Sequence, residues 1–408
     1  FIRYKGSSMH GEMKSGLFFL LLLMLSETVC GRTFTDSKGR EIDAEICGFD
    51  GEKVELILSK NGKIYEIAIS VLCEEDQAFV RQWREQEKTL IGASGEDVVS
   101  HPKENFDADW PRLVSVEIGI DVEVLSENEV NEEFVYHSPN YEFVSDVKLT
   151  KSLVKKFAVM FEATREFCRL LPISTMKAHL PGEQFRNKIL LFEHEETYIK
   201  NGGIPGSAGV FVSRGGTGVV MVPLTSLGVI KGKAGFRFDW DGSNKTLPHE
   251  LTHQLTDVEY FSSGARGWFS EGLAEYVAVT PYRSGKYMVR SNLDEIRDYV
   301  TAYGEKGNGG RALGEKFTAP DLEQFMMQSY ESFIQNANFN YGVGLLLTYY
   351  FFHMEDDRSN IVAFLKALKE GKSGQEAVDV LLNGRTYDEL EEQVSRAWKS
   401  RGIKISFE

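Results

Sequence analysis

The stretch Thr246-Leu-Pro-His-Glu-Leu-Thr-His-Gln254 decides most of what the sequence says about the fold. We expect it to open a helix, because Thr246 is a favourable N-cap residue and Pro248 suits a first turn. The leucines in and just after it recur at helical spacing and predict a side that is anchored in a core. These leucines are Leu247, Leu251 and Leu255.

The other side of this helix carries residues that suit a metal ion. His249 and His253 are four residues apart, so both imidazoles project from the same face. Two such nitrogens can occupy two positions around one Zn²⁺. Glu250 lies about 100° around the helix from His249. It therefore borders the metal-facing side without being a ligand, which is the place for a base that acts on water.

A second acidic pair follows in the run Trp268-Phe-Ser-Glu-Gly-Leu-Ala-Glu-Tyr276. Glu271 and Glu275 are again four residues apart and share a helix face. A catalytic zinc site needs a third protein ligand, and one of these carboxylates could supply it. The other could accept the spare N–H of a ligand histidine and fix its tautomer. Two glutamates that face the same way are costly to bury unless a cation neutralises them.

The two runs together resemble the gluzincin metallopeptidases, whose pattern is His-Glu-x-x-His followed by Glu-x-x-x-Asp/Glu on a second helix. The resemblance implies that His249, His253 and Glu271 are zinc ligands, that Glu250 is the general base and that Glu275 supports a ligand. Trp-x-x-Glu-Gly-x-Ala-Glu-Tyr is similar to a set of poorly characterised secreted bacterial gluzincins. The resemblance covers residues 130–400 loosely and is specific at 246–276. It implies a secreted zinc peptidase with a metal-activated water and a thermolysin-like fold.

Departures from related patterns narrow this expectation. No Gly-x-Met-Glu-Asn element is present, by which related aminopeptidases hold a substrate N-terminus, so an endopeptidase is favoured. The metzincin pattern is absent, because no Gly and third His follow His253 at its spacing. The resemblance suggests Tyr341 as a donor to the oxyanion, and the alternative is a core aromatic. Val219–Val222 is either an edge strand that pairs with an extended peptide or an ordinary strand of the sheet.

A different class of function remains open beside the enzyme. The chain could be a binding or surface-attached protein that keeps the peptidase fold and its zinc without useful turnover. An enzyme would take a peptide or protein as its substrate. The complete set of five residues around the predicted site favours the enzyme.

Residues 32–90 form a separate predicted module. Three short stretches read as strands, and turn-favouring dipeptides separate them, which fits a small barrel. Phe34-Thr-Asp36, Val54-x-Leu56 and Leu72-Cys-Glu-Glu-Asp-Gln77 resemble the Sla-type homology domain, an SH3-like module. In an endocytic adaptor that domain binds a short peptide, which implies a short-peptide or cell-surface partner. The alternative is a passive spacer. The predicted strands are Glu41–Ile46, Val54–Leu58 and Ile64–Ile69.

The sequence also predicts the nature of the two segments that flank this module. Residues 1–31 are expected to hold an upstream remnant and a signal peptide, because Lys14 precedes a short apolar run. The protein would then be secreted, periplasmic or at the cell surface. Attachment of a lipid at Cys30 is the less favoured alternative. Residues 91–112, with their scattered Gly and Pro, are expected to be a linker.

Composition bounds the remaining choices. The chain has 408 residues and a net charge of −15, which argues against nucleic acid and against adhesion to an anionic membrane surface. Its four cysteines are too few for a disulfide scaffold. Cys47 and Cys73 either pair or are small buried thiols, and Cys168 is expected in the core.

The predicted fold class is α+β, with residues 113–408 mixed α/β at first and mostly helical later. No run after the leader is long enough to span a membrane.

Overall fold

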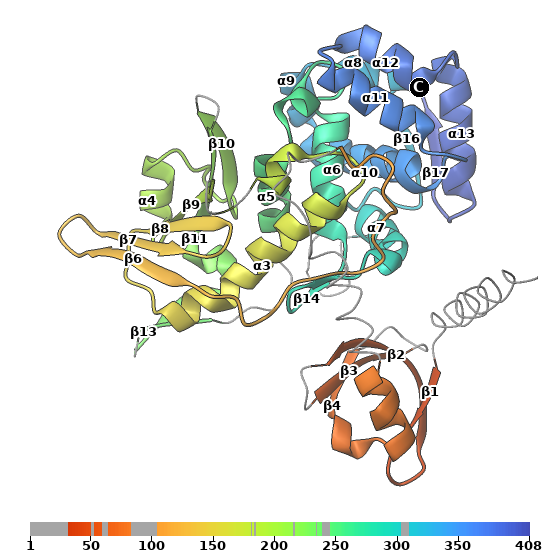
Figure 1. The fold of residues 1–408 in the computed structure, drawn as a ribbon. Coiled ribbons are helices and arrows are strands. Elements are labelled where there is room, and N and C mark those ends of the chain that lie inside the picture. Colours follow the sequence, from red (N-terminus) through yellow and green to blue (C-terminus); the bar gives the residue numbers. More distant parts are fainter. Residues whose placement is uncertain are drawn as a thin grey trace, which may run out of the picture. The chain divides into compact units, whose positions relative to one another are not determined.

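A computed structural model of the chain describes residues 32–49, 53–58, 64–82, 104–180, 182, 185–214, 217–233, 235–238, 245–302 and 310–408. The chain divides into two compact units, residues 1–100 and 101–408, and the division falls within the predicted linker. The predicted leader at 1–31 lies outside the described residues, as does most of the linker. Helices and strands occur together in the fold, so the expected mixture of α and β structure is confirmed (Figure 1).

The N-terminal unit contains an antiparallel sheet in the order β1-β2-β3-β4, followed by a helix over 74–82. We expected a small closed barrel, but in the described part of this unit the sheet stays open. The reason is that β1 is four residues long and pairs with β2 alone among the strands. Beyond β1, the single bridge between Asp36 and Leu72 joins the two ends. The strands are β1 Arg32–Thr35, β2 Glu41–Phe49, β3 Lys53–Leu58 and β4 Ile64–Ala68.

A small core holds this sheet against the helix. Phe34, Val54 and Leu56 on the strands pack with Leu72 and Val80. On the strands, Phe34 and Val54 each follow an exposed residue, which fits a sheet with one buried face. Cys73 is a free thiol in the described part, and the side chain of Cys47 lies outside it.

The C-terminal unit contains a mixed six-stranded sheet in the order β10-β11-β9-β8-β7-β6. Strands β8, β9 and β11 run parallel, and the outer pairs are antiparallel. Gln254 of a covering helix bridges the parallel part, because its amide donates to the carbonyls of Lys188 and Gly218. The strands are β6 Glu123–Asn128, β7 Glu133–His137, β8 Tyr141–Ser145, β9 Asn187–Phe192, β10 Val210–Arg214 and β11 Thr217–Pro223.

Strand β11 corrects one expectation. Val219–Val222 lies between β10 and β9, so both of its edges are already paired and it cannot receive an extended peptide. Strand β10 holds the edge instead. The sequence could not decide this, because a strand that is covered on both faces has the same continuous apolar pattern at the edge of a sheet as inside it.

Both faces of the sheet are indeed covered. Helices α3 (Lys151–Leu170) and α5 (Thr246–Leu255) pack on one face, where their apolar residues join those of the strands. The short helix α4 (Glu195–Lys200) covers part of the other face through Tyr198 and Met221. Helix α3 is capped by the hydroxyl of Thr150 and ends at Leu170, two residues before Pro172, a residue that cannot continue a helix.

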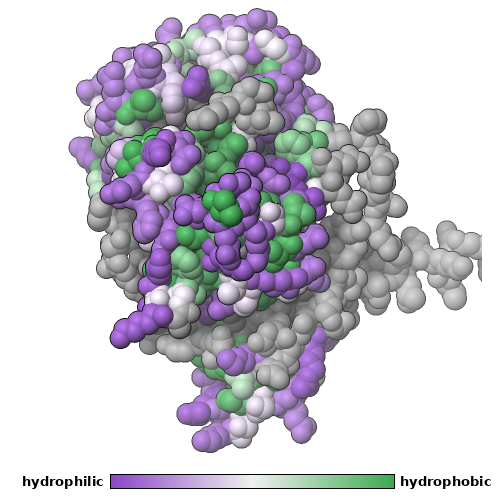
Figure 2. All heavy atoms as spheres, turned by 90° about the vertical axis from the view of Figure 1, so that its left-hand side faces the viewer, coloured by the Kyte–Doolittle hydropathy of each residue, from purple (hydrophilic) through white to green (hydrophobic). Residues whose placement is uncertain are grey.

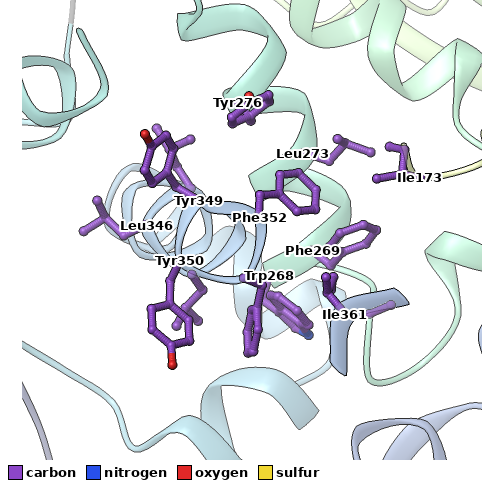
Figure 3. Packing of buried hydrophobic residues seen from close by; sticks show 14 of the residues in the cluster. Ile173, Trp268, Phe269, Leu273, Tyr276, Leu346, Tyr349, Tyr350, Phe352 and Ile361 are labelled. Carbon is purple, nitrogen blue, oxygen red and sulfur yellow. The ribbon is translucent and has the colours of Figure 1, made fainter. Parts of the chain in front are cut away.

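The rest of the unit is mostly helical and has its own large core. Helices α6 and α10 lie at its centre (Figure 3). The residues of Val114–Ile120 suggest a strand, but only Val114–Ser115 forms one (β5), since the glycine-containing part leaves the sheet. The helices are α6 Trp268–Val279, α7 Asn292–Thr301, α8 Leu322–Met327, α9 Tyr330–Gln335, α10 Ala337–His353, α11 Ser359–Lys369, α12 Gly374–Leu382 and α13 Tyr387–Lys399. Short strands are β12 Val229–Gly232, β13 Gly235–Phe238, β14 Tyr282–Arg283, β15 Lys286–Tyr287, β16 Lys316–Ala319 and β17 Lys404–Phe407.

The apolar run Gly342–Met354 is too short to cross a bilayer and predicts a buried helix, and α10 is buried over most of its length. Within the described residues, no helix combines the length and the apolarity that crossing a membrane requires. Most of the acidic excess must be solvated, which predicts a hydrophilic surface. On the face drawn in Figure 2 hydrophilic residues predominate, and hydrophobic ones form small separate areas.

Helices α6 and α10 cross at very close range. A methyl group at Gly272 would lie 2.2 Å from Thr348 Oγ1 and 2.4 Å from the carbonyl oxygen of Gly344. A methyl group at Gly344 would lie 2.8 Å from the carbonyl oxygen of Trp268. The two glycines therefore let the helix backbones touch, and this contact sets the position of Glu271, the residue before Gly272.

Candidate metal centre

Helix α5 brings the first two candidate ligands together at the junction of the two cores. Leu247 and Leu251 are buried in the core against the sheet, and Leu255 is buried in the helical core. The predicted anchoring stripe is therefore confirmed. The helix includes Thr246 as its first residue, with Lys245 at the N-cap position, because the backbone of Lys245 is already close to helical.

Helix α6 brings the candidate third ligand to α5. Glu271 Oε2 lies 3.1 Å from His249 Nε2 and 3.1 Å from His253 Nε2, and the two Nε2 atoms are 3.0 Å apart. All three residues are buried, with at most 8 % of the surface of each exposed. His249, His253 and Glu271 thus form a buried group that could hold a metal ion.

Glu275 lies behind this group and holds one of its histidines. Its Oε1 is 2.9 Å from His249 Nδ1, so it accepts a hydrogen bond from Nδ1–H and leaves Nε2 facing Glu271 and His253. Burial works against charge here. The carboxylates of Glu271 and Glu275 nevertheless outweigh it and raise the pKa of His249 to about 10. The site therefore favours a positive charge between these side chains, supplied by a proton or by a metal ion.

Both carboxylates are stabilised in their ionised form. Burial disfavours the charge of Glu271, but the two histidines overcome it and lower its pKa. Burial likewise disfavours the charge of Glu275, but Arg311 and His249 lower its pKa to about 2. Glu275 is thus neutralised by a protein cation, which the sequence did not predict.

Arg311 lies just beyond α7, far from both helices in sequence. Its Nη2 is 2.7 Å from Glu275 Oε1 and its Nε is 3.1 Å from Oε2. The guanidinium therefore binds the carboxylate in a bidentate manner. No local motif surrounds this arginine, and a sequence reading had no signal that could find it.

Tyr330 is a second contact that the sequence reading missed. Its hydroxyl donates to Glu271 Oε1 at 3.0 Å, so each oxygen of that carboxylate has its own partners. Tyr330 is the first residue of α9, which directly precedes α10 in the chain. The guanidinium carbon of Arg266 lies 4.5 Å from the centre of its ring and helps to hold it.

Glu250 lies beside the group and contacts the edge strand of the sheet. Its Oε2 accepts a hydrogen bond from the backbone N–H of Phe211 on β10 at 2.8 Å. Phe211 is paired with Val220 in the antiparallel register, yet its N–H points away from β11 toward Glu250. One carboxylate oxygen is therefore anchored.

Tyr341, on α10, lies next to the ligands. Its ring stacks on His249 with centres 5.7 Å apart and on Phe333 with centres 5.8 Å apart. Burial first, and then the charge of Glu271, raise the pKa of Tyr341 well above its usual value. Its hydroxyl therefore keeps its proton at neutral pH and remains a hydrogen-bond donor.

The structure brings together all six residues that the sequence singled out for this site. His249, Glu250 and His253 come from α5, Glu271 and Glu275 from α6, and Tyr341 from α10. Cys168, expected in the core, is buried there, and burial raises the pKa of its thiol to about 12. Comparison of the chain with protein-family models, with curated proteins and with solved structures found no match.

Proposed function

We propose that this protein is a zinc-dependent peptidase that cleaves peptide bonds within a chain. The observation that carries the proposal is the buried triangle of His249, His253 and Glu271 with Glu250 beside it. A tetrahedral zinc ion with bonds of 2.0–2.1 Å needs ligand atoms about 3.3 Å apart. The three ligand atoms are 3.0–3.1 Å apart, which is close to one face of that tetrahedron.

The roles of the side chains follow from their places. When bound, zinc would polarise a carbonyl group and make water more acidic. Glu250 would take a proton from the attacking water and pass it to the leaving amine. Its bond to the N–H of Phe211 would keep it in place for both transfers. Tyr341 would donate its O–H to the oxygen that becomes negative as the carbonyl is attacked.

The family and the finer fold belong to the same proposal. The residues at 246–276 resemble those of gluzincins, and α5 and α6 carry them in the order that the resemblance implies. A thermolysin-like arrangement of 113–408 and an SH3-like module at 32–90 are proposed with it. We also propose export through the leader, with a short peptide or the cell surface as the partner of the module.

Zinc should raise the melting temperature of the purified chain. An ion present at about 100 times its dissociation constant adds about 2.7 kcal/mol to the free energy of unfolding. For a unit of this size that is a rise of roughly 5 °C or more. Thermal unfolding with and without a chelator measures the rise. It should disappear in His253→Ala and persist in His194→Ala, because the His194 side chain is 69 % exposed and far from the ligands in sequence.

Metal analysis combined with a peptide-library digest tests the function itself. We expect one zinc ion per chain and cleavage at internal bonds that a chelator stops. Stoichiometric zinc without any cleavage would contradict the enzyme and favour the binding protein that retains the peptidase fold. Release of single residues from one end of each peptide would contradict the endopeptidase.

Tyr341→Phe should lower kcat by roughly 10²- to 10³-fold, the usual loss of one oxyanion donor. KM and zinc content should stay close to those of the wild type, because the ring and its stacking on His249 remain. Steady-state kinetics measure this split. Tyr350→Phe is the matched control: it removes a hydroxyl on the same helix that donates to Gln393, away from the ligands, so kcat and zinc content should stay unchanged. A kcat unchanged by Tyr341→Phe would assign Tyr341 to the core.

A further inference from the structure

The contact between Arg311 and Glu275 has features that go beyond an ordinary ion pair. Glu275 Oε1 receives both the Arg311 bond at 2.7 Å and the His249 bond at 2.9 Å. One oxygen atom therefore connects the guanidinium to the ring of a metal-ligand candidate. Glu275 cannot rotate without breaking one of these bonds, so Arg311 limits the directions in which His249 Nε2 points.

Arg311 is itself held from several sides. Its guanidinium carbon lies 5.4 Å from the centre of the Tyr299 ring and 5.0 Å from that of Tyr341. Its backbone N–H donates to the carbonyl of Tyr299 at 2.7 Å, and its own carbonyl accepts from Asn338 at 2.8 Å. A side chain fixed at both its backbone and its charged end is suited to hold another residue in place.

The charges in the site also require a protein cation. Three carboxylates surround it, those of Glu250, Glu271 and Glu275, and together they carry three negative charges. A divalent ion supplies two positive charges, and Arg311 supplies the third. Without Arg311 the buried site would keep a net negative charge beside the ligands, which is costly in a low-dielectric interior.

We propose that Arg311 is a positioning residue of the metal centre, which acts through Glu275 to orient His249 and to balance the charge of the loaded site. This inference rests on the proposed metal centre. It does not require that the protein hydrolyse peptides. Removal of a residue that holds a metal ligand, without itself binding the metal, typically lowers metal affinity 10- to 100-fold.

A double-mutant cycle on the full chain tests this, with zinc alone as the probe. The variants are Arg311→Met, Glu275→Gln and the two combined, and zinc affinity is measured by competition with a chelator. Arg311→Met should weaken zinc binding by about 10- to 100-fold. In the Glu275→Gln background it should change the affinity by less than about threefold, since its carboxylate partner is already gone. The absorption spectrum of the Co²⁺-loaded protein should shift in both single variants.

Two further variants distinguish a specific effect on zinc affinity from a general loss of stability. Arg385→Met removes the ion pair of Arg385 with Glu355, which has the same 2.7 Å distance and similar burial away from the site. It should lower the melting temperature and leave zinc affinity unchanged. Arg311→Lys keeps the charge but cannot bind the Glu275 carboxylate in a bidentate manner. Its zinc affinity should therefore lie between those of Arg311→Met and the wild type.

The outcomes separate this inference from the proposed function. Zinc affinity within about threefold of the wild type in folded Arg311→Met, or full additivity of the two substitutions, would overturn the role of Arg311. A loss of affinity with the expected coupling supports it, even if no peptide is cleaved and the proposed hydrolysis fails. A wild-type chain that binds no zinc would overturn both.

Discussion

Glu250→Gln should reduce peptide hydrolysis by roughly 10²- to 10⁴-fold, the range for loss of a general base. The amide has the shape of the carboxylate and its oxygen can still accept the N–H of Phe211, which is 2.8 Å away in the wild type. It cannot, however, take a proton from water. Zinc should stay bound, because Glu250 is not among the three residues that could hold the ion.

The measurement is a rate of cleavage together with zinc content and melting temperature. Glu331→Gln is a matched control, because it removes an exposed carboxylate next to Tyr330 and should leave the rate unchanged. A Glu250→Gln protein that cleaves at the wild-type rate would show that another group accepts the proton. Loss of zinc in this variant would instead place Glu250 among the ligands.

Gly272→Ala should cause the largest loss of stability among single-methyl changes at the α6–α10 contact. The added methyl would lie 2.4 Å from the carbonyl oxygen of Gly344, a backbone atom that cannot rotate away. Overpacking of this kind costs about 1–3 kcal/mol, and occasionally more. The helices must separate to relieve it, and Glu271 moves with α6. Zinc affinity should therefore fall as well.

Chemical denaturation and chelator competition measure these two effects. Gly342→Ala, also on α10, is the matched control. Its methyl would lie 2.8 Å from a terminal methyl carbon of Leu313, which can turn aside. The control should cost clearly less stability. Equal losses in the two variants would mean that the close approach of Gly272 and Gly344 does not position α6.

Much of the site could be predicted because its members are local in sequence. His249 and His253 are one helical turn apart, as are Glu271 and Glu275, and helix geometry alone puts each pair on one face. The leucine stripe of α5 follows from the same periodicity, the end of α3 follows from Pro172, and the burial of α10 follows from its continuous apolar run. The sequence could not place Val219–Val222 within its sheet or exclude closure of the N-terminal barrel. Both depend on which strands become neighbours.

The residues that surround the ligands show where sequence reasoning ends. Tyr330, Arg311 and the N–H of Phe211 contact Glu271, Glu275 and Glu250 from elements 59, 36 and 39 residues away. Such contacts between distant elements produce no spacing pattern in the sequence. A backbone N–H, in addition, is present in almost every residue, so residue identity cannot single it out. The sequence by itself determined which residues could bind a metal ion, because that follows from spacing within single helices. Only the tertiary structure decided how the glutamates are held and neutralised, because those partners meet them through packing between helices and sheet.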